Sequence, residues 1–190
     1  MNDQAAIRDA FETAMEMARD LGRDRLGIVG YGVIELFGAD GSLKLARPFA
    51  NQITDVGDLY YTQQAVAGIP PVNGTGAATK VTGMQIGSGV TAVAKSGAGG
   101  GMVTFLAGQA FDATYPQVNN LGAGLGVEAV YKTTYAAAVG TGTVNEATIT
   151  NGTIGSTQGA STTLARILTG AITKAAGDSL AITWRHKFLG

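Results

Sequence analysis

The chain lacks cysteine and is poor in charge, and both shortages restrict its possible functions. Without cysteine it forms neither disulfide bonds nor thiolate metal sites, and its redox compartment cannot be inferred. Charged residues make up 14% of the 190 residues, whereas about 25% is typical of soluble domains. Glycine and small polar residues must therefore form much of the surface. Such a surface repels its own copies weakly, so we expect it to pack against other chains.

Neither sign of charge dominates, since 13 basic and 14 acidic residues give a net charge of −1. No basic patch is available to neutralise a phosphate backbone, so we expect no nucleic-acid partner. The first twenty residues mix both signs of charge and contain no apolar segment, which predicts that there is no signal peptide. Apolar runs stay far below the roughly 18 residues of a membrane span. We therefore expect a protein that is made in a cytoplasm and has no membrane partner.

Glycine, in contrast, is abundant, with 29 residues where a typical share of about 7% would give far fewer. The glycine groups "GYG", "GAGLG" and "SGAGGG" do not form a strand–GxGxxG–helix unit, and no GxxxxGK[ST] motif occurs. We therefore predict that the protein binds no nucleotide and no other cofactor. For residues 97–101 we predict a flexible loop tip.

Residues 3–21 are predicted to form an amphipathic helix, because apolar residues recur at helical spacing. Asn2 or Asp3 can cap its start, and Gly22 can end it. Two arrangements are open: the helix packs on its own domain, or it docks as an arm on a neighbouring chain, since "GRDRLG" behind it resembles a linker. We predict a helical arm at 1–25 and a β-sandwich domain at 26–190. The candidates for inter-chain contact are Ile7, Phe11, Met15 and Ala18.

A hairpin and a second helix are predicted to follow. The strand that begins near Ile28 turns at Asp40-Gly41, a strong two-residue hairpin signal, and the return strand is expected to end at Pro48. Thr54 is a suitable N-cap for a short helix that stops before Gly68. The stretch "IPPVNGTGAAT" then indicates a loop.

The remaining residues indicate an all-β region. In the last strand Leu180, Ile182, Trp184, His186 and Phe188 share one face, which is the alternation of a half-buried antiparallel strand. With the hairpin this gives about eight short strands separated by turn residues. The sequence thus predicts a mainly β protein: a jelly-roll-like antiparallel β-sandwich with an N-terminal amphipathic helix and one further short helix. The candidate strands of this region are 80–86, 102–107, 126–136, 144–150, 163–174 and 178–188.

His186, the only histidine, is the first candidate for chemistry. A catalytic triad or a metal site would need acidic partners, but this half of the chain contains only Asp112, Glu128, Glu146 and Asp178. We therefore interpret His186 as a residue at the rim of the core or at an interface, and we predict no metal site.

A pair of carboxylates for glycoside hydrolysis is the second candidate. Glu128 and Glu146 are the only glutamates of the β-region, and they lie on different strands. Tyr115, Tyr131 and Tyr135 could serve as platforms for sugars, although core packing would account for two of the three. We predict that the protein is not an enzyme and has no catalytic residue.

Four phrases, taken together, carry a family resemblance: "ELFGADGSLKLARPFANQITDVGDLYYTQQ", "VTGMQIGSGVTAVAKSG", "NEATITNG" and "LARILTGAITKAAGDSLAITWRHKF". Over residues 33–188 the chain resembles virion surface proteins of tailed bacteriophages. The shared pattern includes a final strand of the form K-x-x-x-D-[ST]-L-x-[IV]-x-W. The resemblance implies a jelly-roll-like sandwich that decorates heads or belongs to tails and fibres, and it implies no catalytic residues.

These observations lead us to expect a structural virion protein, and specifically a capsid decoration (cement) protein that stabilises the phage head. The alternative is a tail or fibre component that contacts a host receptor or glycan. Decoration is favoured because the chain is short and has neither a coiled-coil shaft nor an internal repeat. The expected partners are copies of itself, as a homotrimer, and other virion proteins such as the major capsid protein. The expected location is the virion, after synthesis in the host cytoplasm.

Overall fold

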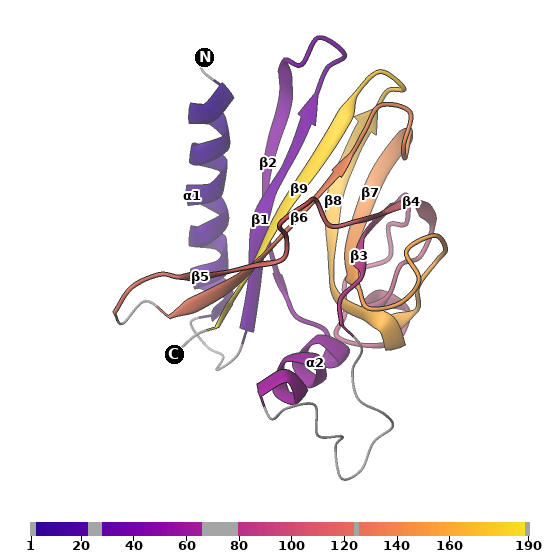
Figure 1. Ribbon diagram of the computed structural model, residues 1–190. Coiled ribbons are helices and arrows are strands. Elements are labelled where there is room, and N and C mark those ends of the chain that lie inside the picture. Colours follow the sequence, from indigo (N-terminus) through magenta and orange to yellow (C-terminus); the bar gives the residue numbers. More distant parts are fainter. Residues whose placement is uncertain (1–2, 23–27, 66–79, 124–125, 189–190) are drawn as a thin grey trace.

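The computed structural model describes residues 3–22, 28–65, 80–123 and 126–188 (Figure 1). Two antiparallel sheets face each other, with strand orders β2-β1-β9-β6-β5 and β4-β3-β7-β8. The mainly β antiparallel sandwich with two helices is therefore confirmed, and its connections are compatible with a jelly roll. The five-stranded sheet consists of β1 (Ile28–Phe37), β2 (Leu43–Gln52), β5 (Gln117–Asn120), β6 (Val127–Tyr135) and β9 (Ser179–Phe188). The four-stranded sheet consists of β3 (Gly83–Gly87), β4 (Phe105–Ala110), β7 (Gly142–Thr150) and β8 (Thr163–Lys174).

Strand β9 supplies the centre of the core. It pairs with β1 on one side and β6 on the other, and its even-numbered residues face the opposite sheet. Trp184 is fully buried, meets the Phe49 ring edge-on at 5.0 Å and donates its indole N–H to Asn51 Oδ1 at 3.1 Å. The predicted inward face of the last strand is thus confirmed. His186 is fully buried as well, so its predicted place at the rim of the core is wrong.

The hairpin of β1 and β2 forms as predicted, but it is longer. Gly41 adopts a φ of +80° in the turn, where a side chain would be strained. Pro48 does not end β2, because the strand continues to Gln52 and Pro48 pairs with Val33. The strand lies at the edge of its sheet, which is where proline is tolerated in β-structure.

Helix α2 (Asp55–Ala65) closes one end of the sandwich (Figure 1). The Thr54 hydroxyl accepts a bond from the Gly57 N–H at 3.0 Å, so the predicted N-cap is confirmed. The same hydroxyl lies 2.6 Å from the Thr163 carbonyl oxygen of β8, which fixes the start of the helix on the four-stranded sheet. The predicted stop at Gly68 and the loop that follows lie outside the described residues.

The outward faces of the two sheets are covered in different ways. Helix α1 (Asp3–Gly22) lies along β1 and β2 of the five-stranded sheet (Figure 1). Irregular segments, residues 88–104 and 151–162, cover the four-stranded sheet. They include two short 3-10 helices, η1 (Gly97–Gly100) and η2 (Ala160–Thr162). The amide of Gln85 on β3 donates to the carbonyls of Ile154 at 3.1 Å and Ser156 at 2.6 Å, which holds the second segment in place.

Candidate interaction surfaces

Helix α1 packs on its own sheet through small side chains. Ala10, Ala14 and Ala18 are buried, and the last two pack in a cluster with Val29 and Tyr31 of β1. This contact is the first of the two arrangements that the sequence left open. It also places Ala18, 4% exposed, against the chain's own sheet.

The other three candidate residues for inter-chain contact lie beside this seam. Ile7 and Phe11 are partly buried and Met15 is exposed. Together they line an open groove of about 480 Å³ between the helix and the sheet. Contact of Ile7, Phe11 and Met15 with another chain stays a prediction. The predicted linker lies almost entirely outside the described residues.

A buried carboxylate on the outward face of the five-stranded sheet ties this region together. Glu128 of β6 is fully buried and forms an ion pair with Arg185 of β9. It also accepts hydrogen bonds from the Tyr31 hydroxyl and, at 3.1 Å, from the Asn119 amide. The guanidinium of Arg185 lies over the Phe11 ring, 5.0 Å from its centre, a cation–π contact that reaches α1.

The Tyr31 hydroxyl acts as a hydrogen-bond donor to Glu128 in this cluster. Burial, and then its bond to the Glu128 carboxylate, raise the pKa of Tyr31 well above its usual range. Its hydroxyl therefore keeps its proton at any physiological pH. The cluster connects α1 with strands β1, β5, β6 and β9. Its interactions hold these elements together, which is a structural role.

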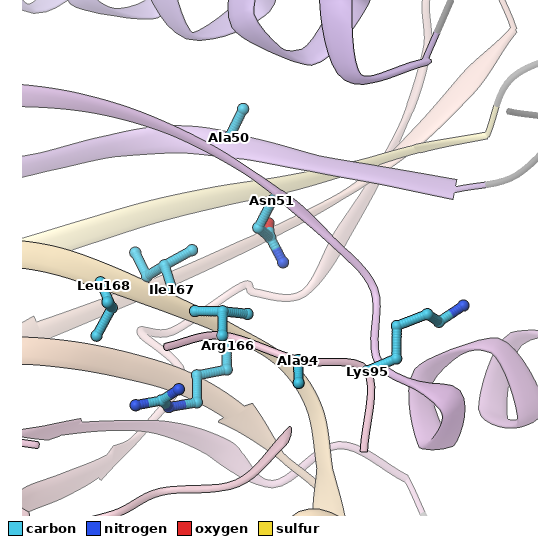
Figure 2. A pocket seen from close by; sticks show the side chains of 8 residues that line it. Ala50, Asn51, Ala94, Lys95, Arg166, Ile167 and Leu168 are labelled. Carbon is cyan, nitrogen blue, oxygen red and sulfur yellow. The ribbon is translucent and has the colours of Figure 1, made fainter. Parts of the chain in front are cut away.

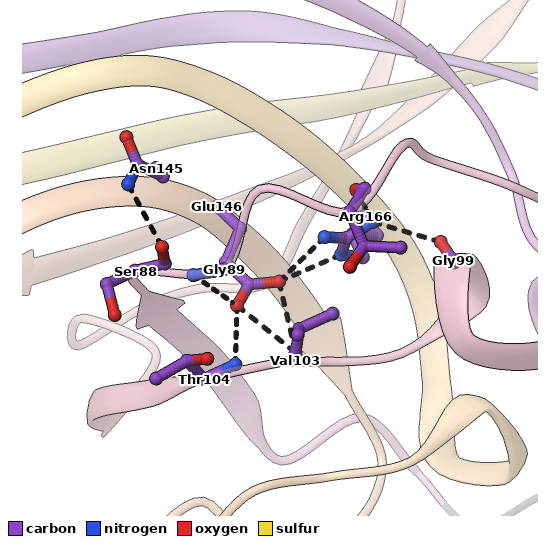
Figure 3. A network of polar contacts seen from close by, with 9 residues as sticks. Ser88, Gly89, Gly99, Val103, Thr104, Asn145, Glu146 and Arg166 are labelled. Atoms are coloured by element: carbon purple, nitrogen blue, oxygen red, sulfur yellow. Dashed lines mark hydrogen bonds and ion pairs between the residues drawn. The ribbon is translucent and has the colours of Figure 1, made fainter.

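A second buried carboxylate, Glu146 of β7, organises the outside of the four-stranded sheet (Figure 3). Its Oε1 accepts the backbone N–H groups of Gly89 at 3.0 Å and Thr104 at 2.8 Å. Its Oε2 lies 2.9 Å from both Nε and Nη2 of Arg166 on β8. One carboxylate thus fixes both ends of the segment 88–104.

Arg166 completes the same network from the other side. It is fully buried, and its Nη1 donates to the carbonyl oxygens of Thr91 at 2.9 Å and Gly99 at 3.1 Å. A buried ion pair is tolerable only where further hydrogen bonds compensate for lost hydration, and here both partners have them. With the Val103 N–H, which also donates to Glu146, the two side chains bind five residues of one irregular segment.

The prediction of a flexible loop tip at residues 97–101 is wrong for this reason. Residues 97–100 form η1, and Gly99 and Gly100 are buried. A Cβ on Gly99 would lie 2.4 Å from the Ala92 carbonyl oxygen, and one on Gly101 would lie 2.6 Å from the Ala160 nitrogen. Gly99 thus permits close packing within segment 88–104, and Gly101 permits close packing against segment 151–162, so neither glycine serves to make the chain flexible.

A third network stabilises the turn between β8 and β9. Lys174 is buried, and its Nζ donates to the carbonyls of Ala136 at 3.0 Å and Asp178 at 2.6 Å. The Asp178 carboxylate accepts from Lys44 Nζ at 2.7 Å and from the Ala175 N–H at 3.1 Å. The hydrogen bond from Lys44 is the main cause of the lowered pKa of Asp178. The lysine and aspartate of the K-x-x-x-D pattern therefore stabilise the fold at this turn.

His186 belongs to an aromatic cluster at the α2 end of the sandwich. The Tyr61 hydroxyl lies 2.7 Å from that of Tyr131 and also contacts His186 Nδ1. Burial lowers the pKa of His186 to about 3, so the ring is neutral at physiological pH. A cavity of about 260 Å³ beside the cluster is lined by Tyr60, Tyr61, Tyr131 and Phe188, among others. The structure shows no acidic partner for His186 within the described residues.

The carboxylates considered for glycoside hydrolysis do not meet. Glu128 lies on the outward face of the five-stranded sheet and Glu146 on that of the four-stranded sheet, with the sandwich between them. Tyr131 and Tyr135 belong to the core, as predicted for two of the three tyrosines, and Tyr115 is partly buried. Among the described residues, no three acidic or histidine side chains gather as metal ligands would. No helix in the described ranges is long and apolar enough to cross a membrane.

The sequence did not single out Arg166. Its signal is its position within "LARIL", where a charge stands between apolar residues of a strand. Such a charge must find a buried partner, because an unpaired charge in the interior is very costly. The spacing alone could not tell which carboxylate it meets, because Glu146 lies on the neighbouring strand.

A further cavity lies where the edge strands of the two sheets approach each other. It has about 320 Å³ and lies between β2, β8 and the segment 88–104 (Figure 2). Asn51, Val93 and Leu168 are among the residues that line it. Comparison of the chain with protein-family models, curated proteins and solved structures found no match.

Proposed function

We propose that this protein is a structural component of a tailed-bacteriophage virion and acts as a capsid decoration protein that stabilises the head. One observation carries the proposal. The buried carboxylates Glu128, Glu146 and Asp178 each bind a basic side chain and further donors, and each holds separate segments together. These buried charged side chains hold loops, strands and a helix in fixed positions, which suits a rigid surface component.

Two further features support the proposal. The phrases that resemble virion surface proteins include Lys174, Asp178 and Trp184, and all three have architectural roles in the fold. The low share of charged residues suits a protein whose surface is in contact with other chains. A shell component also gains stability from its neighbours by mass action.

A tail or fibre component that contacts a host receptor or glycan is the second candidate. It is favoured by the cavity beside Tyr60, Tyr61 and Phe188, because aromatic rings with polar hydroxyls are suitable for binding sugars. Tyr131 bonds to Tyr61 in the same cluster, so the rings are already held in fixed positions.

The two candidates make opposite predictions for purified protein. It would be added to phage particles assembled without it and, separately, to host cells, and bound protein would be located on particles by electron microscopy. A decoration protein occupies regular positions on the head and raises the temperature at which the particle releases its DNA. Density on the tail, together with binding to host cells, would support the second candidate. Binding to neither would contradict both.

A further inference from the structure

The exposed charge of this molecule is distributed very unevenly. Residues 83–110 and 142–174, which contain the whole four-stranded sheet, include only four charged residues: Lys95, Glu146, Arg166 and Lys174. At the typical share of about one quarter, a stretch of this length would carry about 15. Glu146, Arg166 and Lys174 are fully buried, and Lys95 pairs with carboxylates of α2. The outward side of this sheet with segments 88–104 and 151–162, called the uncharged face below, presents almost no charge to water.

Large apolar side chains are exposed on the uncharged face. Val90 is 72% exposed, and Val93, Val103 and Leu168 are exposed too. Two observations link their positions. Glu146 binds the backbone next to Val90 and at Val103. Val93 and Leu168 line the same cavity, in which Figure 2 shows Leu168. An apolar patch of this kind favours association with another surface.

The patch is also held in a fixed conformation. The backbone on which Val90, Val93 and Val103 stand is the segment fixed by Glu146 and Arg166 (Figure 3). A surface that is already ordered loses little conformational entropy when it binds. The buried ion pair therefore presents these valines as a ready binding surface.

Helix α1 has the opposite character. Seven of its 20 residues are charged, five of them acidic and two basic. In a contact across a two-fold axis the same patch of both copies meets, and residues near the axis face their own copy. Two α1 helices would thus bring acidic groups together, whereas two uncharged faces meet without repulsion between like charges.

We propose that the uncharged face, centred on Val90, Val93, Val103 and Leu168, is the surface through which copies of this chain associate. The occupant is a second copy, because an uncharged surface matches its own copy electrostatically and offers no charge by which to select a charged partner. The proposal deepens the proposed function by naming its self-contact. It concerns the purified chain alone, so it can fail while binding to the phage head succeeds, and the reverse.

The test is sedimentation equilibrium of the full chain and of Val90→Glu. A carboxylate at this exposed position leaves the fold intact but places like charges in the contact, so the dissociation constant should rise at least about tenfold. Val118→Glu is the matched control, because Val118 is 79% exposed but lies on β5 of the other sheet. It should leave association unchanged. Leu168→Glu is a second variant on the uncharged face and should weaken association like Val90→Glu.

Salt gives an independent readout. Association through an uncharged face should change by less than about twofold between low and high salt, while contact between acidic helices would strengthen as salt screens their repulsion. The proposal is overturned if the wild-type chain is monomeric at millimolar concentration. It is equally overturned if Val90→Glu and Leu168→Glu associate like wild type, or if Val118→Glu weakens association as much as they do. Thermal melting curves confirm that each variant is folded.

Discussion

Among single residues, His186 makes the stability of this fold depend on pH. Its pKa of about 3 in the folded chain lies below its ordinary value of 6.5, so the unfolded chain binds the proton more readily. The contribution is complete above pH 6.5 and is lost progressively as the pH falls toward 3. Between pH 7.5 and 5.5 we expect the free energy of unfolding to fall by about 1.4 kcal/mol. Urea unfolding at the two pH values measures this loss.

The control for this prediction is His186→Gln, which has no titrating group at the site. The variant should unfold with nearly the same free energy at pH 7.5 and 5.5, even though it is less stable at both. An equal loss in wild type and variant would mean that other groups cause the pH dependence.

Trp184 tests the packing of the core. It is fully buried between the sheets, so we expect Trp184→Ala to lower the free energy of unfolding by about 3–5 kcal/mol. The variant also leaves Asn51 without its indole donor. Trp184→Phe keeps most of the ring and should cost clearly less. If denaturant unfolding gave both variants the stability of wild type, the inward face assigned to β9 would be wrong.

At the scale of elements, the pair of Glu146 and Arg166 holds the segment 88–104. Glu146→Gln leaves a buried guanidinium without its counter-charge, and we expect a cost of about 3–5 kcal/mol in unfolding free energy. Arg166→Met should lower the free energy of unfolding by a similar amount, because it leaves the buried Glu146 carboxylate without its counter-charge. The double variant should cost less than the two single changes added together, since it buries no unpaired charge. Simple additivity in denaturant unfolding would contradict the coupling.

Helix α1 provides the second prediction at this scale. Deletion of residues 1–25 removes an element that contacts the sandwich mainly through three alanines and the ring of Phe11. We therefore expect a folded β-domain, recognisable by a cooperative melting transition, that attaches more weakly to the phage particle in a co-sedimentation experiment. If the truncated chain does not fold, the helix is part of the core. If it binds as strongly as before, the helix is not the attachment arm.

The elements that the sequence predicted well are those whose pattern is local. The alternation in residues 178–188, the turn at Asp40-Gly41 and the cap at Thr54 each depend on neighbouring residues, and each is present in the structure. Strand β5 was missed because "QVNN" is short and has no apolar alternation, and its one apolar residue, Val118, faces solvent. Its pairing with β6 is decided by distant parts of the chain.

The same distinction explains the errors at the candidate surfaces. The order in segment 88–104 comes from two distant residues: Glu146 lies 42 residues from its partner Thr104, and Arg166 lies 67 residues from its partner Gly99. The local sequence "SGAGGG" contains no pattern that predicts these partners. The strand predicted at 102–107 accordingly begins later, at Phe105, because Val103 and Thr104 bind the Glu146 carboxylate instead.

For the whole molecule, we predict a homotrimer. The self-contact surface proposed above gives a dimer where the same patch of two copies meets, so a ring of three copies needs a second patch on each chain. The number three comes from the resemblance to phage surface proteins. Light scattering coupled to size exclusion should give three times the chain mass of 19.3 kDa. A monomer at high concentration would contradict the prediction, and a dimer would keep the self-contact but not the trimer.

The position of β9 in its sheet also has a consequence for how the protein is made. The strand lies between β1 and β6, yet it is translated after every other described strand. Until β9 has been translated, β1 is paired only with β2, and β6 is paired only with β5. The core side chains of the five-stranded sheet thus stay exposed to solvent until β9 has emerged from the ribosome. Folding must then be rapid relative to aggregation, although pairing between distant segments is inherently slow.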